Sequence, residues 1–147
     1  MGKGRISRLV VCGTLVVVVG VGLVLLLSGA ATAPTTEGLI LQATGYASTA
    51  AAGNRNEAYV IVAAYNEAGP IRGLAAGSLS VAVVAAPAGA DPLKKVTVTE
   101  PVSGVYKIAL VPELSSHRWS NGSYGISITL TSANGSGVVL ATLEIGS

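Results

Sequence analysis

WSNGSYGISITL, residues 119–130, is the stretch of this chain that decides its fold. Apolar side chains stand at every second position, since Tyr124, Ile126, Ile128 and Leu130 alternate with small or polar residues. Alternation of period two is typical of a strand with one buried face, because successive side chains point to opposite faces of a sheet. The Asn-Gly pair before Tyr124 favours a turn. The stretch therefore predicts a turn followed by a half-buried strand.

The same alternation recurs along the chain, separated by Gly, Pro and Asn, and no segment after residue 36 has helical spacing. With the strand over residues 124–131, we expect strands over residues 39–47, 58–66, 79–86, 95–99, 104–111 and 138–145, and a short edge segment over 71–74.

The alternation also predicts which side chains are buried. We expect Val96 and Val98 to face the core in one strand, and Tyr106, Ile108 and Leu110 in the next. The Asn-Gly sequence at 134–135, between the last two strands, predicts a tight hairpin.

Seven strands at this spacing are typical of an antiparallel two-sheet sandwich of immunoglobulin type. Tyr124 follows a Gly-containing turn and stands two residues before the inward Ile126, which is the place of the tyrosine corner in that fold. Residues 58–74 (AYVIVAAYNEAGPIRGL), 102–112 (VSGVYKIALVP) and 119–130 resemble, in this order, bacterial immunoglobulin-like and prealbumin-like sandwich modules. The resemblance implies an all-β, seven-stranded immunoglobulin-like sandwich on an exported protein, and it carries over no ligand residues.

The first 36 residues predict a targeting segment. Lys3, Arg5 and Arg8 precede an apolar run, residues 9–27, which we expect to form a hydrophobic helix. The small residues that follow are typical of a signal-peptide cleavage site, whereas about 20 apolar residues also span a bilayer. Residues 1–36 are therefore either a signal peptide or an N-terminal transmembrane anchor. In both cases we expect the β domain, residues 37–147, to be secreted or membrane-anchored outside the cytoplasm.

The charge distribution argues against nucleic-acid binding. The chain has nine basic and seven acidic residues, and three of the basic ones lie in the N-terminal segment. The remaining six are scattered and are balanced by seven acids, so the β domain lacks the positive surface that neutralises phosphates.

Cys12, the single cysteine, lies in the apolar run. We therefore expect burial of apolar side chains, rather than a disulfide, to stabilise the β domain.

The sequence predicts no catalytic, cofactor or metal site. His117 is the only histidine, and the acidic residues are isolated from one another. A triad of His117, Asp91 and a serine is conceivable on paper, but no nucleophile-elbow motif surrounds any serine. We predict that the protein is not an enzyme and needs no cofactor.

Two kinds of surface feature remain as candidate sites. His117, Arg118 and Trp119 form a candidate interaction loop, with packing at the end of the sandwich as the other role for Trp119. Asn121 and Asn134 each begin an Asn-Gly-Ser sequon and are candidate glycosylation sites. Turn chemistry explains both Asn-Gly pairs equally well.

These features predict a non-enzymatic β-sandwich module for structural, adhesive or protein–protein interaction at the cell envelope. Its expected partner is an envelope or extracellular protein, and residues 9–27 would contact the membrane if they are not cleaved. The alternative is a subunit of an extracellular filament or surface layer, which would form homo-oligomers. In both cases we expect exposed edge strands to bind the partner, because unpaired backbone groups accept an added strand.

Overall fold

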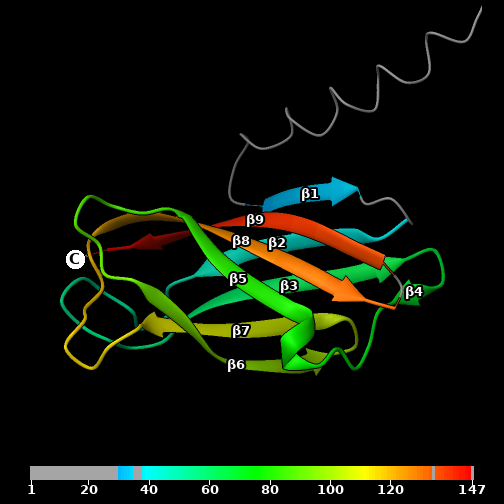
Figure 1. Ribbon diagram of the computed structural model, residues 1–147, viewed down its shortest axis with the longest axis horizontal. Coiled ribbons are helices and arrows are strands. Elements are labelled where there is room, and N and C mark those ends of the chain that lie inside the picture. Colours follow the sequence, from blue (N-terminus) through cyan, green and yellow to red (C-terminus); the bar gives the residue numbers. More distant parts are fainter. Residues whose placement is uncertain (1–29, 35–37, 134, 147) are drawn as a thin grey trace, which may run out of the picture.

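Antiparallel strands make up most of the described part of the chain (Figure 1). The computed structural model describes residues 30–34, 38–133 and 135–146. A single-turn 3₁₀ helix, η1 (Ala76–Ser78), precedes β5. The strands are β1 (Ala30–Pro34), β2 (Ile40–Tyr46), β3 (Ala58–Asn66), β4 (Gly69–Pro70), β5 (Leu79–Ala85), β6 (Leu93–Val102), β7 (Val105–Pro112), β8 (Gly122–Ser132) and β9 (Gly135–Ile145).

The predicted all-β fold is confirmed for these ranges. The hydrophobic helix expected over residues 9–27 lies outside the described residues. Within the described ranges, no helix is long and apolar enough to cross a membrane.

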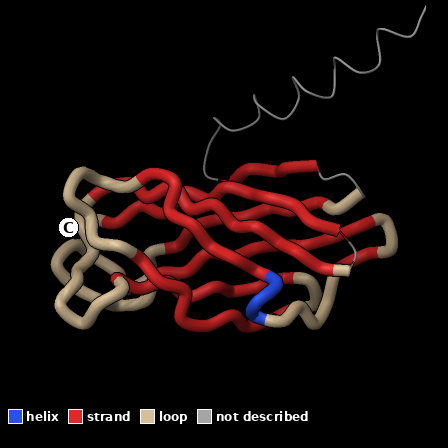
Figure 2. The backbone as a smooth tube through the Cα atoms, in the orientation of Figure 1, coloured by secondary structure: helices blue, strands red, loops and turns tan. Residues whose placement is uncertain are grey.

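The strands are neighbours in the order β5-β8-β9-β1-β2-β3-β7-β6, and β4 pairs with the end of β3. β1 pairs with β2 along its whole length but meets β9 only at Ala30 and Ala141. The array therefore divides at this point into two antiparallel sheets, β5-β8-β9 and β1-β2-β3-β7-β6, which Figure 2 shows as the long red segments.

The expected count of seven strands is wrong, because eight strands follow one another in this order among the described residues. The additional strand is β1, which lies in the segment that the sequence assigns to targeting. Its extended backbone completes hydrogen bonds along the edge of β2.

One apolar core lies between the two sheets, with residues of both sheets in a single cluster of buried side chains. The alternating set in β8, from Tyr124 to Leu130, is 0% exposed. Tyr106, Ile108 and Leu110 of β7 are also buried, as predicted. At about 25 cal/mol per Å² of buried apolar area, these side chains provide the main stabilisation of a domain without disulfides.

β2 and β9 approach each other closely at Gly45. A Cβ atom at this position would lie 2.1 Å from the carbonyl oxygen of Thr142 and 2.9 Å from the Cα atom of Leu143. Only glycine allows the two backbones to come this close. The two sheets are therefore in backbone contact where Gly45 of β2 meets Thr142 and Leu143 of β9.

The prediction for β6 is wrong at one residue. Val98 packs against the core, but Val96 is 46% exposed. Lys95 pairs with Leu110 and Thr97 with Ala109, so Val96 is the extra residue of a β-bulge. A bulge shifts the alternation by one position, and a pattern read from sequence alone assumes an unbroken alternation.

The β8–β9 hairpin is confirmed, with pairs that run from Gly122 and Ile145 to Ser132 and Gly135. The expected turn at Asn-Gly 134–135 is wrong, because Gly135 pairs with Ser132 and already belongs to β9. β9 begins at Gly135 rather than at Val138, because the ladder continues through Ser136 and Gly137. Gly135 has a φ of +116°, a conformation that favours glycine.

Candidate functional site

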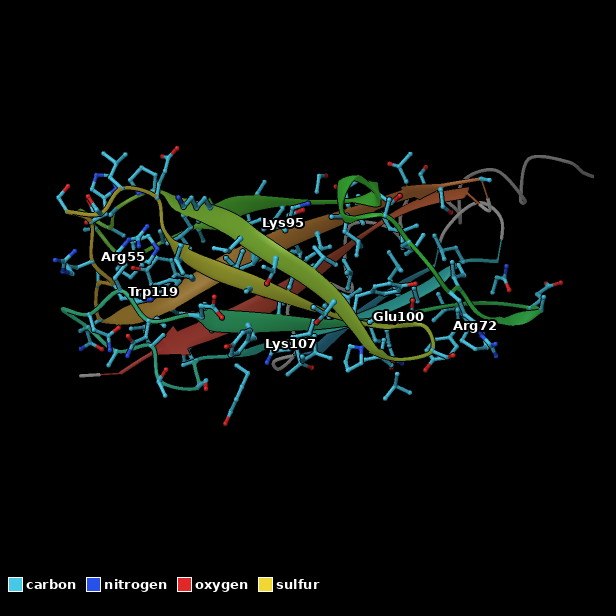
Figure 3. The ribbon with its side chains drawn as sticks, turned by 90° about the horizontal axis from the view of Figure 1, so that it is seen from below. Arg55, Arg72, Lys95, Glu100, Lys107 and Trp119 are labelled. Atoms are coloured by element: carbon cyan, nitrogen blue, oxygen red, sulfur yellow. The ribbon has the colours of Figure 1, made fainter. Side chains whose placement is uncertain are left out.

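The loops over residues 47–57, 86–92 and 113–121 gather with the end of β9 at one end of the domain, on the left of Figure 1. This end contains His117, Arg118 and Trp119. Figure 3 shows Arg55 and Trp119 here, and Arg72 and Glu100 at the opposite end. The chain thus places the predicted interaction loop beside the loop that precedes β3.

Trp119 lies inside this end of the core, with 1% of its surface exposed. Its indole Nε1 donates a hydrogen bond to the carbonyl of Asn56 at 2.7 Å, and its backbone N–H donates to the carbonyl of Asn54 at 2.9 Å. Its ring meets that of Tyr124 edge to face, with centroids 5.4 Å apart. This position favours the packing role for Trp119.

The hydroxyl of Tyr124 is bonded to the backbone of the same loop. Tyr124 Oη accepts a hydrogen bond from the N–H of Ser120 at 3.0 Å and donates to the carbonyl of Ser120 at 3.3 Å. The tyrosine therefore joins the start of β8 to the loop that carries Trp119, as expected of a tyrosine corner.

We expect Tyr124→Phe to lower the free energy of unfolding by about 1 kcal/mol or somewhat more, since both backbone groups of Ser120 lose their partner. Urea denaturation of the full chain in detergent measures this change. Tyr65→Phe is the matched control and should leave the midpoint unchanged, because Tyr65 is exposed. A Tyr124→Phe midpoint equal to that of the parent would contradict a stabilising role for these bonds.

His117 and Arg118 lie on the surface of the same loop, and both contact Asp91. His117 Nε2 is 3.8 Å from Asp91 Oδ1, and the N–H of Arg118 donates to Asp91 Oδ2 at 2.9 Å. His117 Nδ1 accepts from the N–H of Leu114 at 3.3 Å, so the neutral ring carries its proton on Nε2. In the described part of the chain no serine hydroxyl bonds to His117. The contacts of His117 and Asp91 hold the loop in place, and the interaction role of the loop stays a prediction.

Arg55 connects the two loops at this end. Its Nε donates to the carbonyls of Pro112 at 3.1 Å and Leu114 at 2.9 Å, and its Nη2 donates to the carbonyl of Glu113 at 3.3 Å. Sequence reasoning did not single out Arg55, because its acceptors lie more than 50 residues away along the chain.

The outer face of β2 and β3 carries exposed aromatic and aliphatic side chains. Tyr46 stands opposite Tyr59, and Ile40 stands opposite Tyr65, on neighbouring strands. Tyr46 is 61% exposed, Ile40 45% and Tyr65 36%. We call these four residues the tyrosine face.

A groove lies beside the tyrosine face on the same sheet, with a volume of about 510 Å³. It is lined by Thr49, Arg55, Asn56, Glu57, Tyr59, Lys94, Val96 and Val111. Tyr59 Oη donates to Glu57 Oε2 at 2.9 Å, and this bond raises the pKa of Tyr59. The ammonium of Lys107 lies 3.6 Å from the centre of the Tyr59 ring, a cation–π contact.

The edge strands β5 and β6 are partly protected. β6 carries Lys94, Lys95 and Pro101 and two register shifts, all of which discourage pairing with another chain. Lys95 Nζ donates to the carbonyl of Ala76 at 2.6 Å and to that of Leu79 at the start of β5. These contacts favour the outer face over the edges as an interaction surface, and binding at the edges stays a prediction.

The structure describes one of the two candidate glycosylation sites. Asn121 is exposed in the turn before β8, as a glycosylated asparagine must be, and Asn134 lies outside the described residues. Over residues 30–34, 38–133 and 135–146, no group of three or more His, Cys, Asp or Glu residues could hold a metal ion.

A clamp at the opposite end of the domain was not anticipated. Glu100 accepts hydrogen bonds from the N–H groups of Gly73 and Gly104, both at 2.8 Å. The bond from Gly104, and then that from Gly73, lowers the pKa of Glu100 below its ordinary value. Tyr106 Oη donates to the carbonyl of Ile71 at 2.7 Å, and burial raises the pKa of this hydroxyl. The clamp ties the segment before η1 to the β6–β7 hairpin.

We expect Glu100 to stabilise the fold most above pH 5 or so, because its folded pKa lies below the unfolded value near 4.5. This contribution should disappear as the pH falls through the folded pKa. Glu100→Gln should therefore be less stable than the parent at pH 7 and should lose less stability on acidification. Urea midpoints at pH 7 and pH 3 measure both effects.

Glu144→Gln is the control for this comparison, since Glu144 is exposed on β9. Equal pH dependence of Glu100→Gln and the parent would contradict the clamp.

No family model, curated protein or solved structure matches the chain.

Proposed function

We propose that the chain is an immunoglobulin-like sandwich module that acts by binding another protein at the cell envelope, without catalysis. The strand order supports this classification. The order β6-β7-β3-β2 on one side and β5-β8-β9 on the other corresponds to the four-stranded and three-stranded sheets of the constant-type immunoglobulin fold. β1 is an additional strand at the β2 edge of the first sheet. The bonds from Tyr124 to the backbone of Ser120 correspond to its tyrosine corner.

The N-terminal segment supports a location outside the cytoplasm. A basic cluster before an apolar run of this length directs a chain to export or anchors it in a membrane. The module is therefore secreted, or tethered through residues 9–27 with the sandwich on the outer side.

The tyrosine face is the observation that carries the binding function. Tyrosine is enriched at the centres of protein interfaces, because its ring buries a large apolar area and its hydroxyl remains able to hydrogen bond. Tyr46 and Tyr65 stand near opposite ends of the β2–β3 ladder, and the smaller side chains of Gln42 and Ala63 pair between them. An exposed face with aromatic residues at both ends suits a folded partner.

Photo-crosslinking in intact cells of the source organism tests this proposal. A photoreactive phenylalanine replaces Tyr46 or Tyr65 in the full chain, and the control position is Ser80, which is exposed on β5 at the far edge of the other sheet. We expect the same protein adduct from both tyrosine positions and none from Ser80. Equal adducts from all three positions, or no adduct from either tyrosine position, would overturn the proposed binding face.

A further inference from the structure

The groove on the outer face lies over Val111 of β7, and Ala109 lies on the same face of this strand. Ala109 and Val111 of β7 point away from the core, in the opposite parity to Ile108 and Leu110. They are nevertheless only 2% and 6% exposed, because longer side chains of β6 and β3 rise on either side. Lys94 pairs with Val111, and Tyr59 pairs with Ala109.

Cationic groups dominate the rim. Arg55 and Lys94 line the groove from different elements, and Lys107 stands next to it over the Tyr59 ring. Glu57 is the one acidic residue of the lining, and it already accepts a hydrogen bond from Tyr59. The groove thus offers excess positive charge above an apolar floor.

Arg55 is held in place before any ligand arrives. Three backbone carbonyls accept hydrogen bonds from its Nε and Nη2. Among the described residues no acceptor is recorded for its Nη1, whose donors remain available. A guanidinium fixed in this way loses little side-chain entropy when it binds an oxyanion, and its planar donors match a carboxylate.

We propose that this groove binds a carboxylate carried on an apolar body, with the carboxylate between Arg55 and Lys94 and the apolar part on Val96 and Val111. The volume is within the range of small-molecule sites. The lining is mostly polar, and Val96 and Val111 provide its aliphatic surface. This site goes beyond the proposed protein-binding function and does not depend on it. The carboxylate can belong to a small acid or to an acidic side chain of a peptide, because the chemistry is the same.

NMR titration of the full chain in detergent micelles tests the proposal with two matched pairs of probes. Benzoate and its neutral analogue benzamide represent a small acid. N-acetyl-Phe-Glu-amide and N-acetyl-Phe-Gln-amide represent a peptide. We expect amide shifts at residues 55–59, 94–96 and 111, and about tenfold tighter binding of the charged member of at least one pair. The pair with the tighter acid identifies the source of the carboxylate.

Two variants separate the groove from general charge effects. Lys94→Gln removes one positive charge from the rim, and Arg72→Gln removes one at the opposite end of the domain (Figure 3). We expect Lys94→Gln to weaken binding of the preferred acid about two- to fivefold, the scale of an exposed charge pair, and Arg72→Gln to leave it unchanged.

Either of two results would overturn the site. One is equal affinity for the charged and neutral members of both pairs. The other is an equal loss of affinity in the two variants, since a nonspecific charge effect does not depend on position. Lys94 is exposed on an edge strand, so Lys94→Gln should leave the fold intact, which the unchanged spectrum of residues outside the groove verifies.

Discussion

Trp119→Ala will lower the free energy of unfolding by about 3 to 5 kcal/mol, the usual cost of truncating a buried Trp or Phe. The substitution leaves a cavity at the end of the core, removes the edge-to-face contact with Tyr124, and leaves the carbonyl of Asn56 without its indole donor. The lost hydrogen bond adds less than the cavity, because Asn56 is exposed and water can reach its carbonyl. Because the loop over residues 47–57 bonds to Trp119, we expect this end of the domain to loosen first.

Thermal unfolding of the full chain in detergent, followed by circular dichroism at 218 nm, measures this effect. We expect a drop in melting temperature of roughly 10 °C or more for a domain of this size. His117→Ala is the matched control in the same loop and should change the melting temperature little, because its contacts are a 3.8 Å approach to the Asp91 carboxylate and a long hydrogen bond at the surface. If His117→Ala destabilised the fold more than Trp119→Ala, the packing role of Trp119 would be refuted.

Ile126→Ala will cost about 2 to 5 kcal/mol. Ile126 lies in the centre of β8, is 0% exposed, and stands between Val83 of β5 and Ala141 of β9 in the sheet. The neighbouring strands β5 and β9 restrict relaxation into the cavity, so the loss should fall in the upper part of this range.

Urea denaturation compares Ile126→Ala with Ile40→Ala, which removes the same atoms from an exposed position on β2. We expect Ile40→Ala to cost under about 1 kcal/mol, mostly through strand propensity. Similar losses from both variants would mean that the faces of β8 have been assigned the wrong way round.

The alternation of apolar residues predicted the elements well because it records burial directly. In β7 and β8 each inward side chain expected from the sequence lies in the core, and the strand over residues 58–66 has the expected bounds. Prediction failed where the chain departs from regular pairing. The bulge at Val96 reverses the face of one residue, and β1 adds a strand to the edge of β2.

The candidate site was less accessible to sequence reasoning. His117, Arg118 and Trp119 were correctly placed in one loop, but their burial differs: Trp119 is buried and Arg118 exposed. Arg55 and Glu100 gave no signal, since their partners are backbone groups that any residue supplies. Every residue has a backbone carbonyl, so the identity of a residue does not reveal that its carbonyl accepts a hydrogen bond from a distant side chain.

Local chemistry in the sequence determined the all-β class, the positions of the main strands and the inward set of residues, because period-two alternation and turn residues act within a few positions of each other. Tertiary structure alone decided the contacts between distant segments. The approach of β2 to β9 at Gly45, the bonds of Arg55 across two loops, and the groove over Val111 each depend on which strands become neighbours. That choice minimises exposed apolar area over the whole chain, and no short stretch of sequence contains it.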